Sequence, residues 1–126
     1  MDWKLELIQV PVSDIDRAKA FYERVGFAAE HDHRVDEQVR FVQLTPPGSP
    51  CSIALTSGAH QMQPGSLEGL QAVVDDADAA RAELLDRGVA TGEVHELPWG
   101  RFVFFSDPDG NAWSLQELPQ RPSAAA

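Results

Sequence analysis

Histidine and cysteine are the residues whose spacing in this chain could most directly indicate metal or nucleophile chemistry. His31 and His33 are two positions apart, so on a strand they would project from one face toward a shared ion. No third ligand at a fixed spacing accompanies them, and polar residues on the exposed side of a strand are the commoner explanation. Cys51 is the one cysteine, and no neighbouring base or helix N-terminus is indicated that would lower its pKa. It is interpreted as a small strand residue.

Aromatic and amide side chains form a more informative set. Phe41, Phe102 and Phe104 would share one strand face, while Val42, Val103 and Phe105 would occupy the other. Trp99 stands beside Gly100 just before the second of these strands. Such aromatic walls, combined with nearby glutamines, suit a flat and moderately polar organic ligand.

Motifs for covalent or phosphate chemistry are missing from the sequence. It has no Gly-rich phosphate loop, no Ser–His–Asp order and no nucleophile elbow, and the segment 65–69 is Gly-rich only as a linker. A single cysteine also excludes an internal disulfide and any cysteine-clustered zinc or iron–sulfur site. This cysteine usage fits a reducing compartment, so a cytoplasmic location is expected.

The length and the net charge of the chain limit the classes of partner that it is expected to bind. With 126 residues and 43% hydrophobic residues, the chain can bury a real core as one compact domain or as two small modules. The formal net charge of −10 would repel phosphate backbones and anionic lipid surfaces. The N-terminus lacks the apolar run of a signal peptide, and no stretch approaches eighteen apolar residues. We therefore expect no nucleic acid and no membrane partner.

An internal repeat supplies the elements that must position these residues. The segment 12–18 is echoed by 74–80 at a shift of 62 positions, and Gly26 is echoed by Gly88 at the same shift. The segment 40–42 returns as 101–103. Two similar modules are therefore predicted over 1–62 and 63–118, followed by a disordered tail over 119–126 that carries two prolines and no apolar periodicity.

Each module is predicted to have the order βαβββ. Apolar runs bounded by turn residues predict strands, and apolar residues at helical spacing predict helices. Ser13, with Asp16 three residues later, is expected to start the first helix, and Gly26 to close it. The strands are predicted at 5–12, 27–35, 39–45, 51–57, 70–74, 92–97, 101–106 and 112–118, and the helices at 13–25 and 77–87.

This pattern, with VSDIDRAKAFYERVGF after the first strand and FSDPDGNAWSLQEL at the end, resembles the vicinal-oxygen-chelate superfamily. That superfamily includes glyoxalase I, bleomycin-resistance proteins, fosfomycin-resistance transferases, methylmalonyl-CoA epimerases and extradiol dioxygenases. The resemblance covers roughly residues 3–118 and implies an α+β, glyoxalase-like fold in which two tandem βαβββ modules form cup-shaped mixed sheets. Because the superfamily hosts lyases, isomerases, oxygenases and plain binders, the fold alone selects no activity.

Strand alternation indicates which residues would face the cup. Ile8 and Val10 would pack on the helix, leaving Leu7 and Gln9 inward, and Gln71 occupies the position of Gln9 in the second module. Trp113 is expected to point to the helix side. The complete set of expected ligand-binding residues is Leu7, Gln9, Phe41, Gln43, Gln71, Trp99, Phe102, Phe104 and Ser114.

The resemblance also implies where metal-using members carry their ligands, one from each of four strands. Those positions correspond here to Leu7, Ala54, Gly69 and Ser114, and none carries the expected His, Gln or Glu. No metal and no cofactor are therefore expected. This departure counts against glyoxalase, epimerase and dioxygenase chemistry.

Three functions follow, in order of preference. The first is a metal-free small-molecule binding protein of the bleomycin-resistance type, which sequesters a planar aromatic or natural-product ligand in a cup between modules and confers antibiotic resistance. The second is a glyoxalase-like or dioxygenase-like enzyme with non-standard metal ligands or with acid–base residues such as Glu117 or His33. The third is a structural or regulatory interaction module. A homodimer is expected because the family usually completes one cup with modules from two chains.

Overall fold

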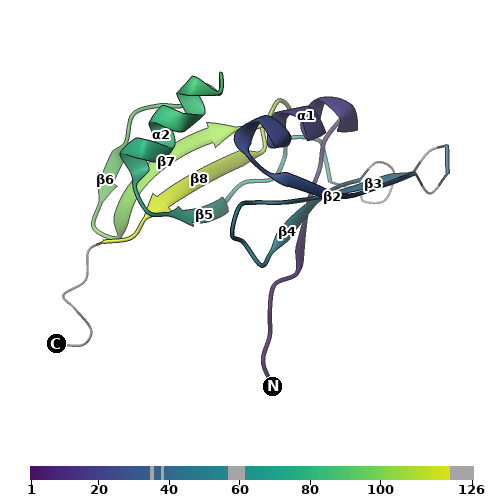
Figure 1. Ribbon diagram of the computed structural model, residues 1–126, viewed down its shortest axis with the longest axis horizontal. Coiled ribbons are helices and arrows are strands. Elements are labelled where there is room, and N and C mark those ends of the chain that lie inside the picture. Colours follow the sequence, from purple (N-terminus) through teal and green to yellow (C-terminus); the bar gives the residue numbers. More distant parts are fainter. Residues whose placement is uncertain (35, 38, 57–61, 120–126) are drawn as a thin grey trace. The chain divides into compact units, whose positions relative to one another are not determined.

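The computed structural model describes residues 1–34, 36–37, 39–56 and 62–119, and its elements follow the order βαβββ twice (Figure 1). The chain divides into two compact units. Unit 1 contains Met1–Glu68 together with Ser106–Asn111, and unit 2 contains Gly69–Phe105 together with the chain from Ala112 onward. A short turn from late in the sequence therefore belongs to the first unit.

Unit 1 is a mixed four-stranded sheet with one helix. Its sheet has the strand order β1-β4-β3-β2, in which β1 is parallel to β4 and the other pairs are antiparallel. The core lies between this sheet and the helix, where Val10, Val42, Leu44 and Leu55 are fully buried together with Tyr22. The elements are β1 (Leu7–Val10), α1 (Ile15–Val25), β2 (Ala28–Arg34), β3 (Arg40–Thr45) and β4 (Ser52–Thr56).

Unit 2 repeats this architecture with the order β5-β8-β7-β6, and β5 is again parallel to β8. Trp113 is buried on the helix side and stacks on Phe105, with ring centroids 5.9 Å apart, as the sequence predicts for a core residue. The elements are β5 (Leu70–Val74), α2 (Ala77–Asp86), β6 (His95–Leu97), β7 (Gly100–Ser106) and β8 (Ala112–Glu117). The predicted α+β fold with two tandem mixed sheets is confirmed.

The N-terminus of α1 differs in one respect from expectation. Asp14, rather than Ser13, is the capping residue, because its extended backbone lets its carboxylate accept from the backbone N–H of Arg17 at 3.0 Å. Ser13 instead donates its hydroxyl hydrogen to Asp109 at 2.6 Å. Gly26 ends the helix in the left-handed conformation at φ 119°, as predicted.

Two predicted strands are shorter than the apolar pattern indicates by three or more residues, and in each of them another group takes a backbone partner. The first was predicted over 5–12 but ends at Val10, since Pro11 has no N–H and its carbonyl accepts from Asn111 and from Gly65. The strand predicted over 92–97 begins only at His95, because Arg81 occupies the carbonyl of Gly92.

The turn at 107–110, predicted from its Asp-Pro-Asp-Gly sequence, is organised by the buried Asp107. One oxygen of Asp107 accepts from three successive backbone N–H groups, those of residues 109, 110 and 111. Its other oxygen accepts from the hydroxyl of Tyr22 at 2.7 Å and from the amide of Asn111 at 2.8 Å. This carboxylate therefore ties the turn to the helix of unit 1.

No helix in the described part of the chain is long and apolar enough to cross a membrane. The predicted tail at 119–126 lies, apart from Pro119, outside the described residues, as does the end of the predicted strand at Ser57.

Candidate functional site

Each sheet has one face that its helix does not cover, and we call this the open face. In unit 1 the register of the strands places Leu7 and Gln9 on this face together with Phe41 and Gln43. Ala54 pairs directly with Gln9 on one side and with Gln43 on the other. The four predicted residues of this unit therefore share one face.

Hydroxyl groups supplement the amides on the open face of unit 1. Thr56 donates its hydroxyl hydrogen to the side-chain oxygen of Gln9 at 2.7 Å. His31 and His33 lie on the same face along the edge strand β2, where both are exposed and their rings stack with centroids 5.7 Å apart. The described residues contain no group of three or more side chains arranged to hold a metal ion.

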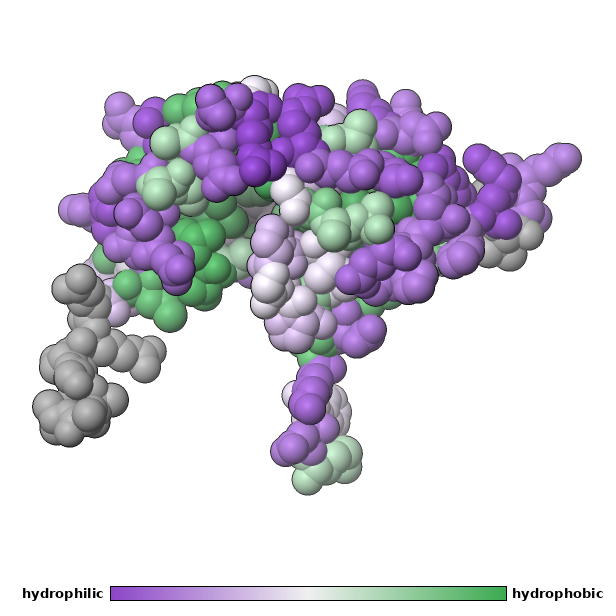
Figure 2. Space-filling view, in the orientation of Figure 1, coloured by the Kyte–Doolittle hydropathy of each residue, from purple (hydrophilic) through white to green (hydrophobic). Residues whose placement is uncertain are grey.

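The open face of unit 2 is aromatic. Phe102 and Phe104 stack in parallel, with ring centroids 6.0 Å apart and planes inclined by 8°, and His95 meets Phe104 edge-on at 5.4 Å. Phe102 is buried, whereas Phe104 is 45% exposed and Val73 is 60% exposed. Figure 2 shows hydrophobic surface on this unit, below helix α2 in the view. Large apolar side chains left in water on one sheet face are typical of a binding surface.

A string of hydrogen bonds crosses this aromatic face from Ser114 to the backbone of Trp99. The hydroxyl of Ser114 donates to the oxygen of Gln71 at 3.3 Å, and the nitrogen of Gln71 donates to the oxygen of Gln116 at 2.7 Å. The nitrogen of Gln116 then donates to the carbonyl of Trp99 at 2.8 Å. Ser114 and Gln116 are buried and Gln71 is exposed. We call these three side chains and that carbonyl the polar string.

Gly100 permits this arrangement. Its φ is 149°, and a Cβ atom there would lie 2.6 Å from the carbonyl oxygen of Glu117 and 3.2 Å from the side chain of Gln116. The turn between β6 and β7 can therefore approach β8 closely only with glycine at this position. As a result the backbone of Trp99 is fixed by Gln116 while its side chain remains 60% exposed.

Sequence reasoning placed its nine candidates on two open faces and missed their partners. The structure brings Gln71 to Ser114 and Phe102 to Phe104, as the alternation indicated. The residues of these faces that sequence reasoning missed are Thr56, Leu97 and Gln116. Gln116 could have been found, since it lies two positions after Ser114 on the same strand.

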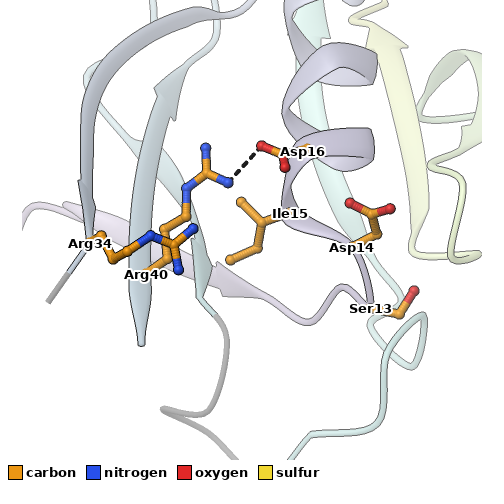
Figure 3. Close-up of a pocket in the computed structure, with 6 residues that line it drawn as sticks. All are labelled: Ser13, Asp14, Ile15, Asp16, Arg34 and Arg40. Atoms are coloured by element: carbon orange, nitrogen blue, oxygen red, sulfur yellow. Dashed lines mark hydrogen bonds and ion pairs between the residues drawn. The ribbon is translucent and has the colours of Figure 1, made fainter. Parts of the chain in front are cut away.

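Unit 1 also has a recess of about 310 Å³ beside the first turn of α1, lined by two arginines, two aspartates, Ser13 and Ile15 (Figure 3). Arg40 forms ion pairs there with Asp16, at 2.6 Å, and with Asp32, at 2.8 Å. Hydrogen bonds from Arg40 and then from Lys19 hold the pKa of Asp32 well below its usual range. The charges of Arg40 and Asp16 are thus paired within unit 1, where the recess lies between helix α1 and the sheet.

Comparison with known proteins decides the family. The sequence profile of the Glyoxalase/Bleomycin resistance protein/Dioxygenase superfamily matches residues 4–115. The chain belongs to this superfamily. An uncharacterized protein of Bacillus subtilis strain 168, YetH, is 30% identical over 115 residues, which is 87% of this chain and 94% of that protein.

Two solved structures from Streptomyces sp. CB03234 are similar to this superfamily member. TnmS3, described as an antibiotic binding protein, is 42% identical with a TM-score of 0.85, and the match covers 94% of this chain and 98% of TnmS3. A glyoxalase/bleomycin resistance protein is 44% identical with a TM-score of 0.78, and the match covers 90% of this chain and 99% of that one.

The metal used by many members of the glyoxalase superfamily does not fit the residues present here. Leu7, Ala54 and Gly69 have no side-chain donor atom, and Ser114 offers only a neutral hydroxyl, which is not among the usual protein ligands of zinc. Glu117 cannot substitute, since its carboxylate accepts from the backbone N–H of Ala77 at 2.8 Å at the start of α2, on the helix side of the sheet.

Proposed function

We propose that this protein binds a planar, moderately polar organic molecule, such as an aromatic antibiotic, on the open faces of its sheets, without a metal and without chemical turnover. The observation that carries the proposal is the stacked pair Phe102 and Phe104 on the strand that follows the exposed Trp99, with amide groups in the same face. Stacked aromatic rings attract a flat ligand, at roughly 0.5–1.5 kcal/mol per pair beyond area burial.

Relatives support the same reading. TnmS3 is described as an antibiotic binding protein, and it matches this chain over nearly its whole length. The substitution of the metal positions by Leu7, Ala54 and Gly69 favours binding over a metal-dependent reaction. The residues proposed to contact the ligand are Leu7, Gln9, Phe41, Gln43, Gln71, Trp99, Phe102, Phe104 and Ser114.

Tryptophan fluorescence tests the proposal. A panel of polycyclic aromatic and flavin-like compounds is titrated into the wild type and into Trp99→Phe. We expect saturable quenching in the wild type that is largely lost in Trp99→Phe. Trp3→Phe is the matched control, because Trp3 is 88% exposed in the N-terminal segment, outside both sheets. Quenching should persist in that variant.

Three results would each contradict part of the proposal. Saturable binding in calorimetry with undiminished quenching in Trp99→Phe would remove Trp99 from the site, and no saturable binding by any planar compound would remove the function. To separate binding from turnover, the bound compound is extracted after prolonged incubation and chromatographed. We expect it to be recovered unchanged, and a new product would instead support the enzymatic alternative.

A further inference from the structure

The orientation of every group in the polar string is determined by a single backbone atom. The carbonyl oxygen of Trp99 can only accept a hydrogen bond, so the atom of Gln116 that lies 2.8 Å away must be the amide nitrogen. The oxygen of Gln116 must then face Gln71, which places the nitrogen of Gln71 toward Gln116 and its oxygen toward Ser114. Amide orientations are ordinarily ambiguous, but here the chain of contacts allows one arrangement.

This fixed direction decides which hydrogen-bonding groups remain for a ligand. Each carbonyl oxygen of the string already accepts one hydrogen bond, and the hydroxyl hydrogen of Ser114 is used. The amide nitrogen of Gln71 carries two hydrogens, of which one goes to Gln116. In the described part of the chain no other acceptor contacts that nitrogen. Gln71 therefore offers an N–H donor on the exposed side of the string.

A ligand that covers this N–H donor without pairing it costs more free energy than one that covers an oxygen of the string. An N–H group buried without an acceptor is unfavourable and rare in proteins, whereas an oxygen with one of its two lone pairs unused is tolerated more often. A flat apolar ligand that covers Gln71 would leave its N–H unpaired. A ligand with a carbonyl oxygen at that place would pair it.

We propose that the polar string makes the open face of unit 2 selective for planar aromatic ligands that carry a hydrogen-bond acceptor, such as aryl ketones, over ligands that carry only a donor. This inference rests on the proposed function, since it specifies the ligand class of the same face. Gln116 is the positioning residue. It does not have to touch the ligand, because it acts by holding the amide of Gln71 in one orientation.

Three rigid tricyclic compounds of nearly equal shape test the selectivity. Fluorenone carries an acceptor, carbazole carries an N–H donor, and fluorene carries neither. Their dissociation constants are measured by equilibrium dialysis with chromatographic detection, which suits their low solubility. For the wild type we expect fluorenone to bind about tenfold more tightly than fluorene, and carbazole to bind no more tightly than fluorene.

Two variants assign the selectivity to the string. In Gln116→Leu the amide of Gln71 loses its fixed partner and can turn, so the ratio of fluorenone to carbazole affinity should fall toward one while fluorene binding changes little. In Gln71→Leu fluorenone should bind as weakly as fluorene. Gln71 is exposed, so this second variant keeps the test valid if Gln116→Leu does not fold. Gln63→Leu, an exposed amide removed outside the sheets, is the control and should keep the wild-type ratio.

The outcomes separate this inference from the proposed function. If all three compounds bind the wild type with equal affinity, or if carbazole binds most tightly, the polar string does not select the ligand, although the face still binds aromatics. If Gln71→Leu retains the preference for fluorenone, the donor lies elsewhere and the inference is wrong. If none of the three compounds binds, the proposed function fails as well.

Discussion

Gln9 and Gln71 each form a diagonal hydrogen bond in their own sheet, which Gln9 accepts and Gln71 donates. Each lies on the first strand of its unit and contacts the residue two places beyond its direct partner on the neighbouring parallel strand, which is Thr56 for Gln9 and Gln116 for Gln71. The repeat thus keeps the contact but exchanges a hydroxyl for an amide. Because the Gln116 amide has a nitrogen donor separate from its accepting oxygen, the second unit extends the contact to a third group, the carbonyl of Trp99.

The first prediction concerns Gly65, which packs against the turn at 107–110. It has φ +79°, and a Cβ atom there would lie 1.9 Å from the carbonyl oxygen of Asp109. Gly65→Ala is expected to lower the free energy of unfolding by about 2–4 kcal/mol, because backbone strain and a clash with backbone add. Urea denaturation measures this loss.

Two other glycines separate the two causes. Gly48 has φ +72° but open space around it, so Gly48→Ala should cost only the strain of about 1–2 kcal/mol. Gly92 has neither feature, and Gly92→Ala should change the free energy of unfolding by less than about 0.5 kcal/mol. Equal losses for Gly65→Ala and Gly48→Ala would show that the turn does not pack closely on Gly65.

The second prediction concerns acid stability. Hydrogen bonds from Arg40 and Lys19 lower the pKa of Asp32 in the folded protein, so the folded state binds this proton less readily than the unfolded state. The resulting stabilisation is present above the unfolded pKa, near 4, and is lost as the pH falls below it toward the folded pKa. Because Asp32 is 31% exposed, we expect about 1 kcal/mol.

Denaturant titrations between pH 7 and pH 2 measure this contribution. Asp32→Asn should be less stable than the wild type at pH 7 and should lose less stability below pH 4. Asp75→Asn removes an equal charge at an exposed position outside this ion-pair network and should follow the wild-type curve. Parallel curves for the wild type and Asp32→Asn would show that Asp32 makes no pH-dependent contribution.

Much of the fold was predictable because the signals that specify it are local. Apolar spacing and turn residues gave the order βαβββ, and the repeat gave its duplication. The end of the first strand at Val10 was predictable from Pro11, which has no N–H, whereas the start at His95 was not, because the carbonyl of Gly92 is taken by the side chain of Arg81. The apolar pattern within one strand contains no information on side chains elsewhere that bind its backbone carbonyls.

The candidate site was likewise predictable only in part. Alternation identified which side chains share an open face, and the structure agrees for all members that lie on strands. It could not identify the polar string. That string depends on the close approach of Gly100 to Glu117, which brings the carbonyl of Trp99 within reach of Gln116.

The third prediction is that the purified protein holds no stoichiometric transition metal, because the positions that bind metal in related enzymes lack donor atoms in Leu7, Ala54 and Gly69. Elemental analysis after dialysis should find far less than one Zn, Ni, Fe or Mn per chain. Retention of about one ion per chain would contradict this and support the enzymatic alternative.

The fourth prediction is a homodimer in solution. Unit 2 leaves Val73, Leu97, Trp99 and Phe104 exposed, and such side chains favour association with a second copy. Light scattering at micromolar concentration should give about twice the chain mass. A monomer mass would show that one chain alone provides the whole binding surface.

The assignment of residues 106–111 to unit 1 has a consequence for synthesis of the chain. Asp107 and Asn111 supply the hydrogen bonds of Tyr22 and Pro11, yet both are translated after most of unit 2. On the ribosome the first 68 residues therefore emerge without the turn that completes their unit. Although N-terminal domains commonly fold first, unit 1 cannot complete its native hydrogen bonds until residue 111 has been translated.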